Sequence, residues 1–296
     1  MEDENLLKEV GKVSFEALSF ARSLVKPGAR KLDVADSLEN FMRERGFGLT
    51  FPVNLSSNEE AAHSTPESGD KSVFGDNDLV KVDLGARKGD ALGDCAITID
   101  LSSEYGKLVE ASEEALEAAI SMVKSGLPVR EIGKSVGEIA AKYGFNPIRN
   151  LGGHGIEKGD LHARIFIPNY DNGDSSVLEE GQTIAIETFI TTGKGYVSDG
   201  DYVQIFRKLG PAQLRSQDSR EVAGFIDENF STYPFALRWL SSKFGSEFKV
   251  KAALNEMARI ENIESFPVLI ESSKGMVAQT EKEMIVEKDS CNVVTK

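Results

Sequence analysis

The chain has few cysteines and no long hydrophobic run. Two cysteines, Cys95 and Cys291, in 296 residues cannot form a disulfide framework, which favours a reducing compartment. No run approaches the roughly 18 apolar residues of a membrane span. The acidic first residues contain no apolar signal segment. We therefore expect a cytoplasmic protein with no membrane partner.

Positive charge is also scarce. Lys and Arg number 34 against 48 Asp and Glu, which gives a formal net charge of −14. Phosphate backbones and anionic membrane surfaces are bound by clustered positive charge. The composition therefore argues against a protein that binds nucleic acid by itself. The length suits one large domain, or one domain with an insertion.

A repeat with a period of 98 residues indicates two related halves. Residues 16–47 and 114–145 align without gaps and are identical at 11 of 32 positions, where unrelated sequences would share roughly two. Each copy holds two segments of helical periodicity, which are 6–25 and 33–44, then 108–123 and 129–143. The period is too long for a solenoid. We predict two half-domains related by a pseudo-two-fold axis.

Strand-like segments follow the helices of the first half. Residues 79–84 and 96–101 have the alternating pattern of strands, which predicts a hairpin, whereas residues 51–76 are typical of a loop. Asp83 and Asp94 are predicted to face each other on this hairpin, with Cβ atoms about 4.5–5.5 Å apart. Because like charges in such a pair are destabilising, we expect divalent cations between them.

The second half supplies further candidate ligands. Glu187 ends the alternating segment 184–187 as Asp83 ends its own strand, and Glu281 lies in a terminal hairpin predicted from residues 267–272 and 277–287. His154 lies among glycines that permit close approach. Each acid alone is more often an exposed strand charge. The set, with the repeat, favours a shared site for manganese, iron, cobalt or zinc.

Residues from about 200 to 270 break the symmetry of the halves. They contain three segments of helical periodicity, which are 219–229, 235–244 and 250–261. We predict an α+β fold with a catalytic domain of residues 1–199 and 271–296. Residues 200–270 are predicted to form an inserted helical subdomain.

Several motifs in this order resemble those of methionine aminopeptidases of type 2, in the compact archaeal-like form without an N-terminal extension. The motifs are Phe51-Pro52-Val53-Asn54-Leu55, Ala61-Ala62-His63-Ser64-Thr65-Pro66, Lys81-Val82-Asp83-Leu84-Gly85, Gly153-His154-Gly155, Ile186-Glu187-Thr188-Phe189 and Gln279-Thr280-Glu281. The resemblance covers essentially the whole chain. It implies the pita-bread fold, in which pseudo-two-fold halves surround a curved antiparallel sheet, and the insertion implies type 2.

The resemblance also implies a dinuclear metal site with two divalent ions per chain. The five ligands would be Asp83 on one ion, Asp94 and Glu281 between both ions, and His154 and Glu187 on the other. The implied reaction removes the initiator methionine from nascent proteins and peptides. In that implied reaction, a hydroxide held by both metal ions would attack the methionine carbonyl.

Further residues match positions with roles in catalysis and substrate binding. Glu187 would pass a proton to the leaving amine. His63 and His162 would hydrogen-bond the scissile carbonyl oxygen or the substrate backbone. Phe51 and Leu161 would line an apolar pocket for the methionine side chain.

Two positions depart from the family pattern, and two other functions stay open. Ser64 stands where Tyr is common and Lys282 where His is common, which affects substrate contacts rather than ligands. The alternatives are an Xaa-Pro peptidase of the same fold and a non-catalytic binding relative. The expected partners are peptide or nascent-protein N termini, with the ribosome as a further candidate. We expect a monomer.

Overall fold

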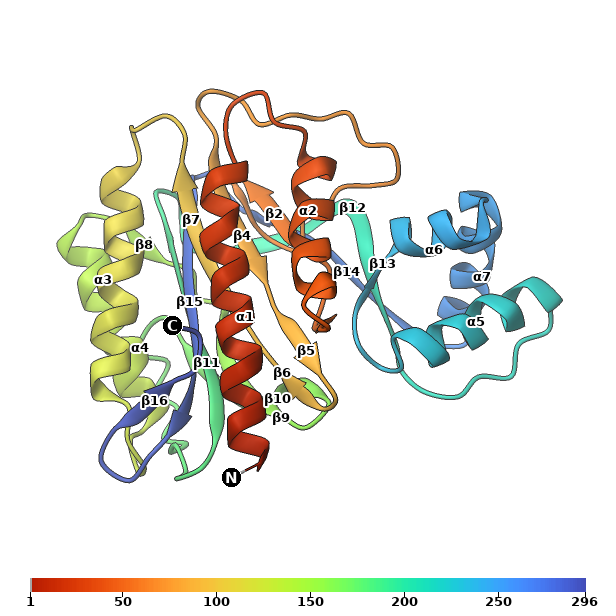
Figure 1. The fold of residues 1–296 in the computed structure, drawn as a ribbon. Coiled ribbons are helices and arrows are strands. Elements are labelled where there is room, and N and C mark those ends of the chain that lie inside the picture. The colour runs from red at the N-terminus through yellow and green to blue at the C-terminus, as the bar shows by residue number, and fades with distance from the viewer. Residues whose placement is uncertain (1) are drawn as a thin grey trace.

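The computed structural model describes residues 2–296, in which helices and antiparallel strands form a layered α+β fold (Figure 1). The helices are α1 (Glu2–Leu24), α2 (Lys31–Glu44), α3 (Gly106–Met122), α4 (Val129–Lys142), α5 (Gln217–Asn229), α6 (Leu237–Phe244) and α7 (Glu247–Arg259). The strands are β1 (Gly48–Leu49), β2 (Asn54–Ser57), β3 (Glu60–Ala62), β4 (Leu79–Leu84), β5 (Ala86–Lys88), β6 (Ala91–Leu92), β7 (Cys95–Asp100), β8 (Asn146–Pro147), β9 (Gly152–Glu157), β10 (Asp160–Pro168), β11 (Thr183–Thr191), β12 (Val197–Lys208), β13 (Phe235–Ala236), β14 (Ile263–Glu271), β15 (Val277–Val286) and β16 (Cys291–Val293). Within residues 2–296, no helix combines the length and the hydrophobicity that a transmembrane span requires.

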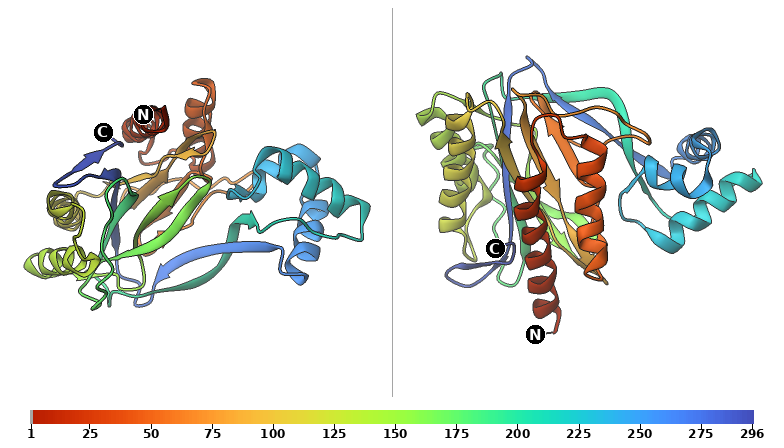
Figure 2. Two further views of the ribbon diagram at one scale, coloured as in Figure 1. Left: turned by 90° about the horizontal axis from the view of Figure 1, so that it is seen from below. Right: turned by 45° about the horizontal axis from the view of Figure 1, so that its top comes forward.

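A nine-stranded antiparallel sheet forms the centre of the fold. Its main path has the order β10-β9-β11-β15-β7-β4-β2, while β16 pairs with β15 and β8 pairs with β11. Helices α1 to α4 cover one face of this sheet, which curves away from them (Figure 2). A second sheet, of order β13-β12-β14-β3, lies beyond the concave face. The predicted α+β class with a curved antiparallel sheet is confirmed.

The two halves of the repeat have matching elements. Adding 98 to the bounds of α2 gives the bounds of α4, and β1 corresponds to β8 in the same way. In the sheet, β2, β4 and β7 on one side take the places that β9, β11 and β15 take on the other. This arrangement confirms the predicted pseudo-two-fold relation, whose axis passes between β7 and β15.

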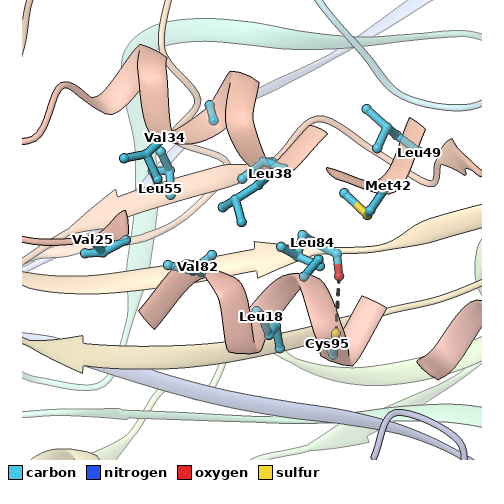
Figure 3. Packing of buried hydrophobic residues seen from close by; sticks show 14 of the residues in the cluster. Leu18, Val25, Val34, Leu38, Met42, Leu49, Leu55, Val82, Leu84 and Cys95 are labelled. Atoms are coloured by element: carbon cyan, nitrogen blue, oxygen red, sulfur yellow. Dashed lines mark hydrogen bonds between the residues drawn. The ribbon is translucent and has the colours of Figure 1, made fainter. Parts of the chain in front are cut away.

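Alternation along the strands separates a helix-facing core from the concave face. In β4, Val82 and Leu84 pack with Leu38 and Met42 of α2 (Figure 3). Each fully buried side chain of this kind contributes about 2 kcal/mol to stability. Asp83 lies between them in the strand, so its side chain points to the concave face. A matching cluster packs α3 and α4 against β11 and β15.

Helices α5, α6 and α7 form a separate group beside the second sheet (Figure 1). Their core contains Val222, Leu240 and Leu254. Strand β12 leads into the group and β14 leads out of it, and the two strands pair with each other. The insertion predicted at residues 200–270 includes these helices, and its boundaries stay a prediction.

Two local predictions are wrong. The terminal hairpin of residues 267–272 with 277–287 does not form, because β14 pairs with β12 and β3 whereas β15 pairs with β11, β7 and β16. Residues 51–76, expected as a loop, contain the short strands β2 and β3. Local alternation identifies a strand, but it does not identify a partner that lies far away in the sequence.

Candidate metal centre

Four strands of the central sheet place three carboxylates in one row. The register pairs Glu187 of β11 with Glu281 of β15, Glu281 with Ala96 of β7, and Ala96 with Asp83 of β4. Residues paired directly across antiparallel strands point to the same side of a sheet. Since the residues that alternate with them pack against the helices, all three carboxylates point to the concave face.

Asp94 and His154 join the row from adjoining positions. Asp94 lies two residues before Ala96, the β7 residue in the row. His154 of β9 pairs with Ala185, which lies two residues before Glu187 in β11. Because both displacements are even, both side chains share the face of the row. One ligand atom each from Asp94, His154 and Glu281 lie within 4.8 Å of one another. His154 Nε2 is 3.4 Å from Asp94 Oδ2.

Asp83 and Asp94 are not directly opposite each other, in contrast to the hairpin prediction. The register pairs Asp83 with Ala96, so Asp94 lies on the diagonal. Just after β4 and just before β7, the backbones of Gly85 and Gly93 approach each other closely, since a Cβ atom on Gly85 would lie 1.8 Å from Gly93 O. The two carboxylates remain close enough for the charge of Asp94 to raise the pKa of Asp83.

Burial makes this group of carboxyls costly to ionise together. Burial, followed by the charge of Asp94, raises the pKa of Asp83 well above its usual range. Burial raises the pKa of Asp94 to about 8. Burial and the neighbouring carboxylates also raise the pKa values of Glu187 and Glu281. Burial lowers the pKa of His154 to about 4, so its imidazole is neutral near pH 7 and free to act as a ligand.

The polar groups around the row do not neutralise its charge. Lys81 shares the face of Asp83, but its Nζ donates to main-chain oxygens at 2.8 and 3.2 Å. Gln279 Nε2 donates to Asp83 Oδ2 at 3.1 Å and to Glu187 Oε2 at 3.3 Å. Asp83 Oδ1 is buried without a hydrogen-bond partner among the described residues. A set of carboxylate oxygens with one imidazole, in which Asp83 Oδ1 still lacks a partner within residues 2–296, suits the binding of divalent metal ions.

One cavity of about 440 Å³ unites the residues predicted for the site. It is lined by Asp83, Asp94, His154, Glu187, Glu281, Phe51, His63, Leu161 and His162. A larger cavity of about 980 Å³, beside the start of α1, is lined by none of them. The smaller cavity is the candidate site, because the predicted metal ligands and the two further histidines line it. The individual roles of these residues stay predictions.

The two further histidines are held by defined contacts. His63 Nδ1 is 3.2 Å from Pro267 O, and its ring meets Phe266 edge to face at 5.5 Å between centroids. Burial lowers the pKa of His63. The ring of His162 meets that of His154 edge to face at 4.5 Å. Burial, followed by the charge of His154, lowers the pKa of His162 to about 3. Both rings are therefore neutral near pH 7.

Sequence reasoning missed several residues that support the site. Gln279 links two of the carboxylates, and the fully buried Glu283 accepts the backbone N–H of Asp94 at 3.2 Å. Both lie two residues from Glu281, so strand alternation alone would have placed them on its face. The contact of Phe266 with the site has no comparable local signal, because β14 belongs to the other sheet.

Comparison with known proteins gives concordant matches. The profile of metallopeptidase family M24 matches residues 5–229. A protein named methionine aminopeptidase from Thermococcus onnurineus (strain NA1) is 41% identical over 296 residues, which cover 100% of both chains. The solved structure of a thermophilic Arx1 has a TM-score of 0.88 at 18% identity and covers 99% of this chain and 91% of its own. A methionine aminopeptidase of Thermotoga maritima has a TM-score of 0.72 at 23% identity, with 100% and 97% covered. The shared fold confirms the predicted pita-bread fold.

Proposed function

This chain belongs to metallopeptidase family M24, and we propose that it is a methionine aminopeptidase of type 2 that acts on peptide and nascent-protein N termini. The observation that carries the proposal is the convergence of four carboxylates and one imidazole in a cavity that also holds the predicted substrate-binding residues. Identity of 41% with a named methionine aminopeptidase, over the full length of both chains, supports it.

We propose that Asp83, Asp94, His154, Glu187 and Glu281 hold two divalent metal ions. Four ionised carboxylates carry a charge of about −4, which one divalent ion would leave half neutralised and two would balance. Cobalt, manganese, iron and zinc all suit this donor set. When bound, such ions act as Lewis acids on the substrate carbonyl and lower the pKa of a water molecule.

Hydrogen bonding supports the role of an acceptor for His63. Pro267 O has no proton to donate, so His63 Nδ1 carries the hydrogen in their contact. Because burial keeps the ring neutral, Nε2 has a free lone pair. We propose that Nε2 accepts the N–H of the substrate backbone, while the neutral His162 offers its one N–H to the developing oxyanion.

Glu187 is the proposed group for proton transfer. One of its oxygens accepts from Gln279, which fixes the plane of the carboxylate in the cavity. A buried carboxyl with a raised pKa gains a proton readily and can pass it to the leaving amine. This role needs Glu187 to lie beside the scissile bond, and it lines the same cavity as His63 and His162.

The methionine side chain has an apolar pocket available. Phe51 and Leu161 line the cavity, and both pack in a small cluster with Leu92, Ile156 and Tyr233. An aromatic and aliphatic wall suits a flexible, polarisable thioether. We propose that this cluster selects methionine at the first position of the substrate.

A comparison of peptides tests the proposal. With metal supplied, we expect release of the first residue from Met-Gly-Met-type peptides at least about 100-fold faster than from Gly-Pro-type peptides, because the apolar pocket stabilises the methionine side chain in the transition state. Chromatography of the released amino acid measures both rates. The reverse preference would indicate an Xaa-Pro peptidase, and no release from either peptide would indicate a non-catalytic relative.

The remaining properties of the protein are proposed on narrower grounds. We propose a cytoplasmic location, since both cysteines are free, with Cys95 buried and Cys291 half-buried. The monomeric state stays a prediction from the sequence. An interaction with the ribosome stays a prediction from the sequence. Ser64 is buried and its main-chain oxygen accepts Leu55 N at 2.7 Å, whereas Lys282 points away from the face of Glu281.

Gln279 should affect the metal site without being a ligand itself. We expect Gln279→Ala to weaken divalent metal binding by about tenfold, because residues that orient metal ligands typically have effects of this size. The substitution removes the amide that orients Asp83 and Glu187. Isothermal titration calorimetry with manganese measures the affinity. Gln213→Ala, at an exposed position of the insertion, is the control. Equal affinities in the two variants would contradict this role.

A further inference from the structure

His63 occupies a backbone conformation that its surroundings must hold. Its φ is 64°, in the left-handed region, which residues with a Cβ atom seldom adopt without support. On the N-terminal side, β3 ends at Ala62 and pairs with β14, the strand that supplies Phe266 and Pro267. On the C-terminal side, the chain continues through a buried segment that contains Thr65.

Arg238 of the insertion helix α6 holds this C-terminal side. Its side chain is 4% exposed, and Nη1 donates to Thr65 Oγ1 at 2.7 Å and to Pro66 O at 3.3 Å. Its Nη2 forms an ion pair with Glu39 of α2, whose side chain is 0% exposed. Thr65 Oγ1 donates in turn to Val53 O at 2.8 Å. One buried side chain thus connects the insertion, α2 and the segment that follows His63.

Neighbouring contacts make this connection firm. Trp239 Nε1 donates to Glu39 Oε2 at 2.8 Å, and the indole packs against both the α1–α2 core and the core of the insertion. The hydroxyl of Tyr202 in β12 donates to Thr65 O at 3.3 Å. Thr65 therefore receives hydrogen bonds from two separate elements that flank or form the insertion, and a shift of α6 relative to α2 would displace it.

We propose that the helical insertion sets the position of His63 in the cavity, with Arg238 and Thr65 as positioning residues. The inference rests on the proposed function, in which His63 binds the substrate backbone. Pairing of β3 with β14 fixes the chain before His63, and the hydrogen bonds of Arg238 fix it two residues later. Loss of either restraint lets His63 relax from its left-handed conformation, which turns its ring away from the substrate.

Thr65→Val is the most direct test, because it removes the hydroxyl and leaves the Arg238–Glu39 ion pair in place. We expect kcat/KM for a Met-Gly-type peptide to fall by about tenfold, since small displacements of a substrate-binding group have effects of this order. Thr65→Ser restores a hydroxyl and should recover most of the loss. Thr232→Val, at an exposed position of the insertion, is the matched control. Manganese affinity measured by calorimetry should be the same in all of these variants.

A double-mutant cycle separates positioning from a general structural effect. If Thr65 acts through His63, adding Thr65→Val to His63→Ala should cause no further loss, because the group that it positions is already absent. If Thr65 only stabilises the fold, Thr65→Val should lower kcat/KM by the same factor in the unsubstituted protein and in His63→Ala. Equal losses of kcat/KM in these two proteins would overturn the inference.

Ring spectra of the three histidines test the inference independently of activity. In Thr65→Val, the ¹⁵N signals of His63 should shift toward a mixture of tautomers as the contact with Pro267 weakens, while those of His154 and His162 keep their positions. Unchanged His63 signals would overturn the inference even if turnover falls. If the unsubstituted protein releases no methionine, the proposed function fails, and the spectra still decide the position of His63.

Discussion

Glu187→Gln should lower kcat/KM for a methionine-terminated peptide by about 10³-fold, within the range that general acid–base groups contribute. The amide has nearly the shape of the carboxylate, but it neither accepts a proton nor binds a metal ion as an anion. Rates of methionine release at saturating manganese measure the effect. Glu180→Gln, at an exposed position, keeps the same change of charge away from the cavity and should retain full activity.

The same substitution should not destabilise the metal-free fold. Glu187 lies directly opposite Glu281, and two buried carboxylates in such a pair repel each other. Replacing one of them by a neutral amide removes this repulsion, so the melting temperature after chelation should stay equal or rise. A fall in melting temperature together with activity would mean that Glu187 acts on folding. Activity within about threefold of the unsubstituted protein would exclude Glu187 from the general acid–base role.

The sequence was most informative where local periodicity and the repeat act together. Alternation in residues 79–84 and 184–187 places Asp83 and Glu187 away from the helix-facing core, and the repeat relates their strands. The alternation depends on neighbours within a few residues, and the repeat is visible from direct comparison of two stretches of the sequence. A sheet with one buried face fixes them strongly, because a slip of one residue would bury the charges against the helices.

Partners distant in the sequence could not be obtained in this way. The predicted hairpin of β14 and β15 failed because the partner of β14 is β12, beyond the whole helical insertion. The diagonal placement of Asp94 also escaped prediction, since it follows from the register of β4 with β7, in which Asp83 lies opposite Ala96. The buried contacts of Glu39 with Arg238 depend on how two cores pack together, and no sequence period reports that.

Metal removal should leave a protein whose stability falls as the pH rises from about 4 to about 8. The pKa of Asp94 is raised to about 8 in the folded state, and those of Asp83, Glu187 and Glu281 are raised as well. In the unfolded chain these groups ionise near pH 4. Above that pH the folded state binds more protons than the unfolded state, so its stability decreases with pH.

The histidines oppose this trend over part of the range. Burial lowers the pKa values of His154 to about 4 and of His162 to about 3, and that of His63 is lowered too, so the unfolded state binds more protons at these positions below about pH 6.5. Their contribution to stability therefore rises with pH and is complete above that value. Above about pH 7 the buried Lys81, whose pKa burial lowers to about 7, also opposes the trend, because only the unfolded state still binds its proton there. The decline should therefore be steepest between about pH 6.5 and pH 7, at about 1.4 kcal/mol per pH unit for each carboxyl that stays protonated.

Calorimetric melting of chelator-treated protein at several pH values tests this expectation. Between pH 6.5 and pH 8 the melting temperature should fall by about 5 °C. Adding manganese at pH 8 to about 1,000 times its dissociation constant should raise it by about 10 °C, because the ions bind only the folded arrangement of ligands. The same addition should restore methionine release. In Glu187→Gln the pH slope should be smaller, since one buried carboxyl is gone. A melting temperature that is independent of both pH and manganese would show that the four carboxylates do not form a common metal site, because a buried cluster of this charge cannot be indifferent to its counter-ions.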